Sequence, residues 1–115
     1  MKELFFICKH CGNITFSTGN TKIICCNDVI EEQSPTKATT DTALIIEEMD
    51  GERYITSNHP MTKDNYITFI AYLKGGELQL FKQYPEWEIN VRIAKRGHGR
   101  LLWYAPDIGL TYMDI

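Results

Sequence analysis

The sequence has no cysteine after residue 26 and only three histidines in its whole length. It also has no basic excess, because its 12 Lys and Arg residues are outnumbered by 15 Asp and Glu residues, which gives a net charge of -3. Nucleic-acid binders usually carry a positive surplus, so no nucleic-acid partner is expected. No apolar run reaches the ~20 residues of a membrane span, and the first residues lack the apolar core of a signal peptide. We therefore expect a soluble, cytoplasmic protein with no membrane partner.

The cysteines that are present form two tight pairs, Cys8 with Cys11 and Cys25 with Cys26. Four thiolates at such spacings can close around one metal ion in a tetrahedral site. In a reducing cytosol, metal explains this cluster better than disulfides do. Gly12 follows the first pair, and glycine tolerates the left-handed backbone that such a turn usually needs. The adjacent cysteines of the second pair should pull the tetrahedron away from ideal angles. We predict one metal ion on these four residues.

The donor set leaves the identity of the metal open, because a tetrahedral set of four thiolates suits both iron and zinc. Reduced thiols without a ligand are the remaining alternative. A module of about 30 residues buries too little apolar surface to fold alone, so bound metal should supply much of its stability.

The rest of the chain shows the alternation of strands, and no segment shows a helical pattern. Short strands are expected at residues 4–7, 13–16, 22–24, 43–49, 54–56, 65–73, 77–82, 86–95, 100–104 and 110–115. Asp50-Gly51 is a strong signal for a two-residue hairpin turn. Within 86–95, Trp87 alternates with polar residues and is expected on a core-facing side. His98, between two glycines, is expected in a solvent-exposed turn. The pattern predicts an all-β protein built around an antiparallel β-sandwich.

Three motifs resemble those of the desulfoferrodoxins, the two-centre superoxide reductases: FFICKHCG, IICC and HPMTKDNYI, the last at residues 59–67. The resemblance covers nearly the whole chain. It implies a desulforedoxin/rubredoxin-like module with a four-cysteine metal site at residues 1–34, a linker at 35–41 and an immunoglobulin-like β-sandwich at 42–115. It also implies iron at the four cysteines and a homodimer.

The second module departs from this family at its mononuclear iron, which four histidine nitrogens and one axial cysteine thiolate hold. His59 stands at one ligand position. Asn65 and Thr42 stand where two other histidines belong, and the remaining ligands fall at Ala105 and Ile108. Because no cysteine follows residue 26, the axial thiolate is missing in any alignment. We predict that this second iron is absent and that His59 is a remnant without a metal or a catalytic role.

Three functions remain open. The leading hypothesis is a desulfoferrodoxin-like protein whose tetrathiolate centre transfers electrons to or from a redox partner, or senses redox state. The second is an active superoxide reductase-type oxidoreductase with an unrecognised site, in which Asp64, Asp107 or Glu47 could assist His59. The third is a structural or interaction protein stapled by zinc. Whether the protein is an enzyme is therefore left open.

Overall fold

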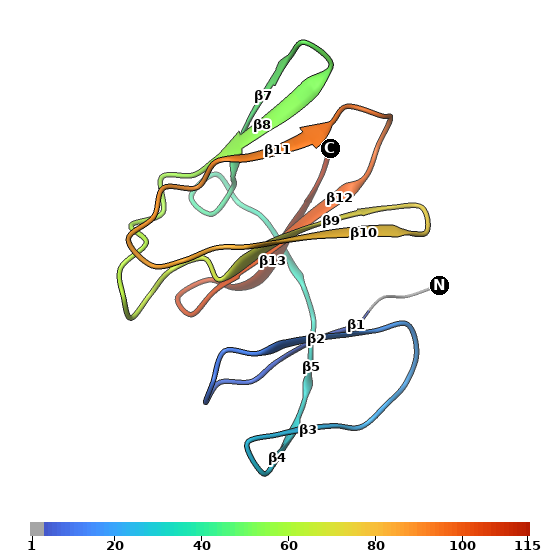
Figure 1. The fold of residues 1–115 in the computed structure, drawn as a ribbon, viewed down its shortest axis with the longest axis vertical. Coiled ribbons are helices and arrows are strands. Elements are labelled where there is room, and N and C mark those ends of the chain that lie inside the picture. Colours follow the sequence, from blue (N-terminus) through green and yellow to red (C-terminus); the bar gives the residue numbers. More distant parts are fainter. Residues whose placement is uncertain (1–3) are drawn as a thin grey trace. The chain divides into compact units, whose positions relative to one another are not determined.

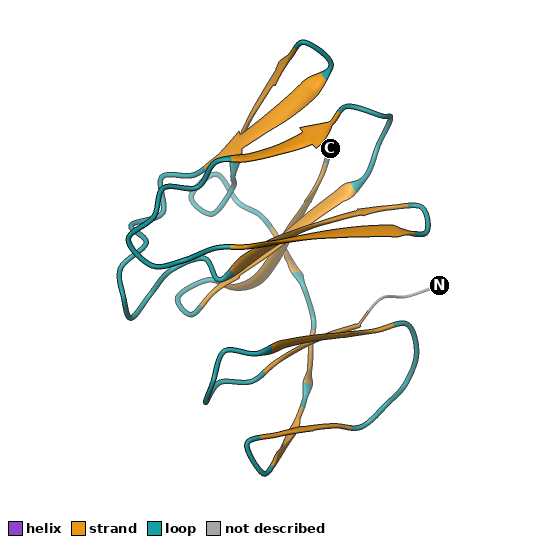
Figure 2. Ribbon diagram, viewed as in Figure 1, coloured by secondary structure: helices purple, strands orange, loops and turns teal. Residues whose placement is uncertain are grey.

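The computed structural model describes residues 4–115, which form thirteen β-strands and, within that range, no helix (Figure 2). This confirms the all-β fold class. No helix in the described range could cross a membrane. The chain divides into two compact units, the first ending at Ser34 and the second running Pro35–Ile115.

Unit 1 contains a three-stranded sheet in the order β2-β1-β5 and a separate β3–β4 hairpin (Figure 1). These strands are β1 (Leu4–Ile7), β2 (Ile14–Ser17), β3 (Ile23–Cys25), β4 (Asp28–Ile30) and β5 (Glu32–Gln33). The strand β1 is the apolar run LFFI, and all four of its residues are buried. Phe5 also meets Phe16 of β2 edge to face, with ring centroids 5.6 Å apart. This central strand of unit 1 leads directly into Cys8, the residue after Ile7.

Unit 2 contains two sheets, β10-β9-β12-β13-β6 and β11-β8-β7 (Figure 1). Their strands are β6 (Thr36–Lys37), β7 (Ile45–Met49), β8 (Glu52–Thr56), β9 (Phe69–Lys74), β10 (Glu77–Lys82), β11 (Val91–Ala94), β12 (Arg100–Ala105) and β13 (Gly109–Asp114). All the pairings in these sheets are antiparallel except that between β13 and β6. Side chains from both sheets share one core, among them Ile55, Ile93, Ile70 and Trp103. Unit 2 is therefore a β-sandwich.

The turn between β7 and β8 follows the sequence prediction. Asp50 has a φ of 54° and Gly51 a φ of 76°. A two-residue hairpin with both central residues at positive φ matches the right-handed twist of its strands. The Asp-Gly pair therefore sets the register of this hairpin, in which Met49 faces Glu52.

Two local predictions were wrong. Trp87 is 70% exposed, because β11 begins only at Val91 and Trp87 lies outside the sheet, directly after a turn in which Glu86 has a φ of 65°. The strand expected from residue 65 begins at Phe69, because Thr62 and Asn65 bond to each other in a loop. The segment 35–41, expected as a linker, includes the two-residue strand β6, which pairs with β13.

Candidate metal centre

The four cysteines come from two turns of unit 1. Cys8 follows β1, and the chain turns so that Gly12 N–H donates to the Cys8 carbonyl at 2.8 Å. Gly12 has a φ of 74°, as expected for the residue that closes this turn. The chain then leaves along β2, with Cys8 N–H bonded to the Asn13 carbonyl at 2.9 Å. These bonds bring Cys11 back toward Cys8.

The second pair lies on the turn between β3 and β4. Cys25 ends β3 and faces Asp28 of β4. Cys26 and Asn27, between them, have φ values of 53° and 65°. Two consecutive positive φ values form the same kind of tight hairpin turn as at residues 50–51. The left-handed backbone of Cys26 lets two neighbouring cysteines face one point, which an extended chain would prevent.

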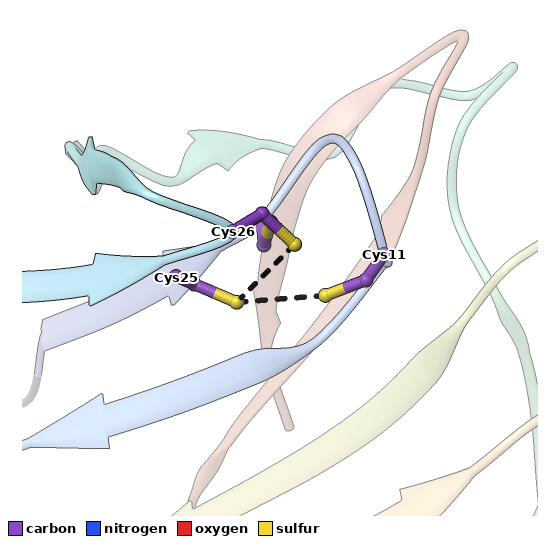
Figure 3. Close-up of side chains that lie close together, drawn as sticks. Cys11, Cys25 and Cys26 are labelled. Carbon is purple, nitrogen blue, oxygen red and sulfur yellow. Dashed lines mark hydrogen bonds between the residues drawn. The ribbon is translucent and has the colours of Figure 1, made fainter.

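The sulfur atoms converge. All four Sγ atoms lie within 4.8 Å of one another. The Cys11 and Cys25 sulfurs are 3.5 Å apart, and those of Cys25 and Cys26 are 3.9 Å apart (Figure 3). Metal–sulfur bonds of ~2.3 Å in a tetrahedron require sulfur separations of about 3.8 Å. The cluster is therefore close to the size that one ion requires.

Hydrogen bonds give these thiols unequal acidity. The backbone N–H of Cys11 stabilises the Cys8 thiolate and lowers the pKa of Cys8 to about 6. Hydrogen bonding to the Cys8 sulfur raises the pKa of Cys26 to about 12, and a bond to Cys11 raises the pKa of Cys25. Of these three thiols, Cys8 therefore loses its proton most readily. A bound cation would replace the thiol protons and favour all four thiolates.

A hydrogen bond between side chains joins the two turns. His10 lies between the cysteines of the first pair, and its Nε2 is 3.0 Å from Asp28 Oδ2 in β4. Both side chains are more than half exposed, so the pair adds little stability. Neither Asp28 nor the β3–β4 hairpin was predicted from the sequence. The Asn27 that follows the adjacent cysteines, a residue that tolerates positive φ, was the available signal.

His59 in unit 2 has a different environment. Its Nε2 lies 3.0 Å from Asp107 Oδ1, and its Nδ1 accepts the Met61 N–H at 3.3 Å. Nδ1 therefore carries the lone pair and Nε2 the proton. Partial burial opposes ionisation of Asp107, but bonds to His59 and Asn65 outweigh it and lower the pKa of that carboxyl. Both nitrogens of this imidazole already have protein partners.

The other positions of the expected second site are partly brought together. Thr42, His59 and Ile108 line one cavity of about 370 Å³, which Asp107 also borders. Asn65 Oδ1 accepts the Asp107 N–H at 3.3 Å. Ala105 is fully buried in the core at the end of β12. Of the three acidic residues considered near His59, only Asp107 contacts it in the described range.

Comparison with known proteins gives a result at the level of the fold. No protein-family model matches the sequence, and no curated protein matches it either. Among solved structures, the superoxide reductase from Treponema pallidum is similar, with a TM-score of 0.79 and 15% sequence identity. The match covers 97% of this chain and 98% of that one. The chain therefore has a superoxide reductase-like fold, in which a cluster of four cysteines could hold a metal ion.

Proposed function

We propose that this chain is a desulfoferrodoxin-like redox protein that holds one iron ion through Cys8, Cys11, Cys25 and Cys26. The observation that carries the proposal is the convergence of the four sulfur atoms to within 4.8 Å. Iron bound by four thiolates supplies one-electron transfer with little change in geometry. The full-length similarity to a superoxide reductase fold supports iron over zinc at this site.

The protein residues have separable roles in this centre. The backbone N–H of Cys11 stabilises negative charge on the Cys8 sulfur, and such bonds raise the reduction potential of thiolate centres. Cys8 is buried, whereas Cys11 and Cys26 are exposed. The exposed pair offers the short path to a redox partner, and the buried sulfur is shielded from solvent.

We also propose that the second iron site is lost. The chain supplies no cysteine for the axial position. His59 would have to give up the Met61 N–H or the Asp107 carboxylate before it could ligate. Amide, methyl and hydroxyl side chains do not replace imidazole and thiolate on ferrous iron. By this proposal the protein does not reduce superoxide.

The test begins with anaerobic purification, metal analysis and a visible spectrum. One iron per chain, with thiolate-to-iron absorption that bleaches reversibly on reduction, is the expected result. Cys11→Ser should abolish that absorption, whereas Lys22→Gln, an exposed change in the same unit, should leave it intact. Zinc alone, with no redox couple, would defeat the electron-transfer function and favour a structural staple.

The loss of the second site has its own experiment. Rapid mixing with superoxide should give a rate no greater than that of free iron at the same concentration. A fast reaction that His59→Ala abolishes would show an active site that the missing ligands do not reveal. Light scattering will test the homodimer, which we propose on the family resemblance alone.

A further inference from the structure

A cleft in unit 2 gathers positive charge in an otherwise acidic protein. It is lined by residues of the β9–β10 hairpin and of the loop after β11, and its volume is about 550 Å³. Pockets of this size accommodate small molecules. Lys74, Arg96 and His98 line it, and Glu77 is the one carboxylate in its wall. Within residues 4–115, none of these three basic side chains has a recorded ion pair or side-chain hydrogen bond.

The loop that carries Arg96 and His98 is held firmly in place. Gly99 exchanges two backbone hydrogen bonds with Ile115, each of 2.9 Å. A Cβ on Gly99 would come within 2.5 Å of the Tyr72 ring and hydroxyl, so the loop backbone packs directly on this phenol. The Lys74 ammonium also reaches this loop, 3.8 Å from the position of a Cβ on Gly97. The backbone that carries Arg96 and His98 is therefore fixed beside the Lys74 ammonium.

A buried cation supports the floor of the cleft. Arg53 is 4% exposed and donates to the Tyr72 hydroxyl at 3.3 Å and to the Gly97 carbonyl at 2.9 Å. Glu48 lies 3.6 Å from Arg53 and also pairs with Lys95, so it only partly balances the buried charge. Tyr72 is 4% exposed, and within the described residues its own hydroxyl proton has no recorded acceptor. Arg53 thus makes Tyr72 a stronger donor.

We propose that this cleft binds a small oxyanion of the phosphate class. The Lys74 ammonium, the Arg96 guanidinium and the His98 ring would contact its oxygens, with the Tyr72 hydroxyl donating from below. Arginine offers a planar pair of donors that matches a phosphate group, and lysine adds a compact charge. The cleft has room for a group larger than phosphate itself, so the anion is either free phosphate or the phosphate of a small ester.

The experiment is an NMR titration of the full-length protein with inorganic phosphate, and in parallel with a sugar phosphate, at ionic strength fixed with sodium chloride. Saturable shifts of the amides of residues 94–99 are expected. Tighter binding of the ester would assign the site to a phosphate on a larger molecule, and equal binding to free phosphate. Both outcomes support the proposal.

Matched variants locate the site. Lys74→Gln and Arg96→Gln should each weaken phosphate binding about tenfold, because each removes a charged hydrogen-bond donor. Glu77→Gln should tighten it about twofold, because it removes the opposing charge. Tyr72→Phe should weaken it about threefold, because it removes the hydroxyl that donates to the anion. Lys63→Gln, an exposed change elsewhere in unit 2, should have no effect.

Three results would overturn the proposal. The first is a response that stays linear and matches that of added chloride, which would indicate screening only. The second is unchanged affinity in both Lys74→Gln and Arg96→Gln. The third is an equal loss in Lys63→Gln, which would indicate non-specific attraction. Thermal melting of each variant will show that the fold is retained, since Arg96 is exposed and Lys74 half-buried.

Discussion

The cysteine cluster and the His59 cavity show how differently two groups of metal-binding residue types can be arranged. In unit 1, four sulfur atoms face one point, and their recorded side-chain partners are one another. In unit 2, both ring nitrogens of His59 are already bonded to Asp107 and Met61. A residue of a metal-binding type forms a site only when its donor atom is not already bonded to the protein and other donor atoms lie close enough to bind the same ion. That condition holds at the cysteines.

The two units also differ in what should hold them together. The core of unit 2 combines buried side chains from both of its sheets, including the fully buried Trp103. In unit 1, the β3–β4 hairpin is largely exposed, with Ile24 63% and Val29 58% exposed. Burial should therefore stabilise unit 2, and the metal should stabilise unit 1.

The largest expected effect separates these two sources of stability. Removal of the metal with a chelator, or Cys25→Ser, should unfold unit 1 and leave unit 2 folded. Structural zinc in thiolate peptides binds with apparent free energies of about 10–16 kcal/mol, which exceeds what so small a unit gains from burial. NMR spectra recorded with and without metal will check this result. Unfolding of both units on metal removal would show that they fold as one cooperative unit.

The next effect tests the core of unit 2 with a matched pair of tryptophans. Trp103→Ala should lower the free energy of unfolding by about 3–5 kcal/mol, because it leaves a large cavity. Trp87→Ala should change it by less than about 0.5 kcal/mol, because that ring is 70% exposed. Urea denaturation measures both. Similar losses in the two variants would mean that Trp87 is covered in solution.

A smaller effect is expected at the loop above Tyr72. Gly99→Ala should cost about 1–3 kcal/mol, because the new methyl group would overlap the phenol at 2.5 Å. Gly76→Ala is the matched change, since a Cβ there meets nothing within 4 Å. Thermal unfolding of the two variants should differ by several degrees. Equal unfolding temperatures for Gly99→Ala and Gly76→Ala would show that the loop does not pack tightly on Tyr72.

The smallest effect concerns the pair of His59 and Asp107. The pKa of Asp107 is lowered in the folded protein, so this carboxylate stabilises the fold above its unfolded pKa of about 3.9. The contribution is lost as the pH falls below that value through the folded pKa. Asp107→Asn should therefore cost about 0–1 kcal/mol at pH 7, since the side chain is 44% exposed, and less at pH 3.

Urea denaturation of Asp107→Asn at both pH values, beside Asp64→Asn, measures this difference. Asp64 is exposed and makes no recorded side-chain bond in residues 4–115. A loss that grows toward low pH, or an equal loss in Asp64→Asn, would contradict the assigned pair.

Several elements could be predicted from local sequence because local geometry decides them. The Asp50-Gly51 turn needs only two residues that accept positive φ, and both adopt it. The run LFFI and the alternation at β11 likewise become strands. The prediction that Trp87 faces the core was wrong because the alternating pattern continues upstream of β11, whereas the strand itself begins only at Val91. A period of two predicts which side chains share a face, and it does not predict where the strand begins.

The spacing of Cys8, Cys11, Cys25 and Cys26 determined by itself that these thiols could meet, because each pair is confined to one turn. Only the tertiary structure decided that the two turns face each other, and that Cys26 can join its neighbour through a left-handed backbone. The same holds for His59, whose partner Asp107 is 48 residues away. The cleft of Lys74 and Arg96 likewise depends on strand order. The sequence determines which metal-binding and charged residue types are present, whereas long-range packing decides which of their donor atoms remain free to bind a ligand.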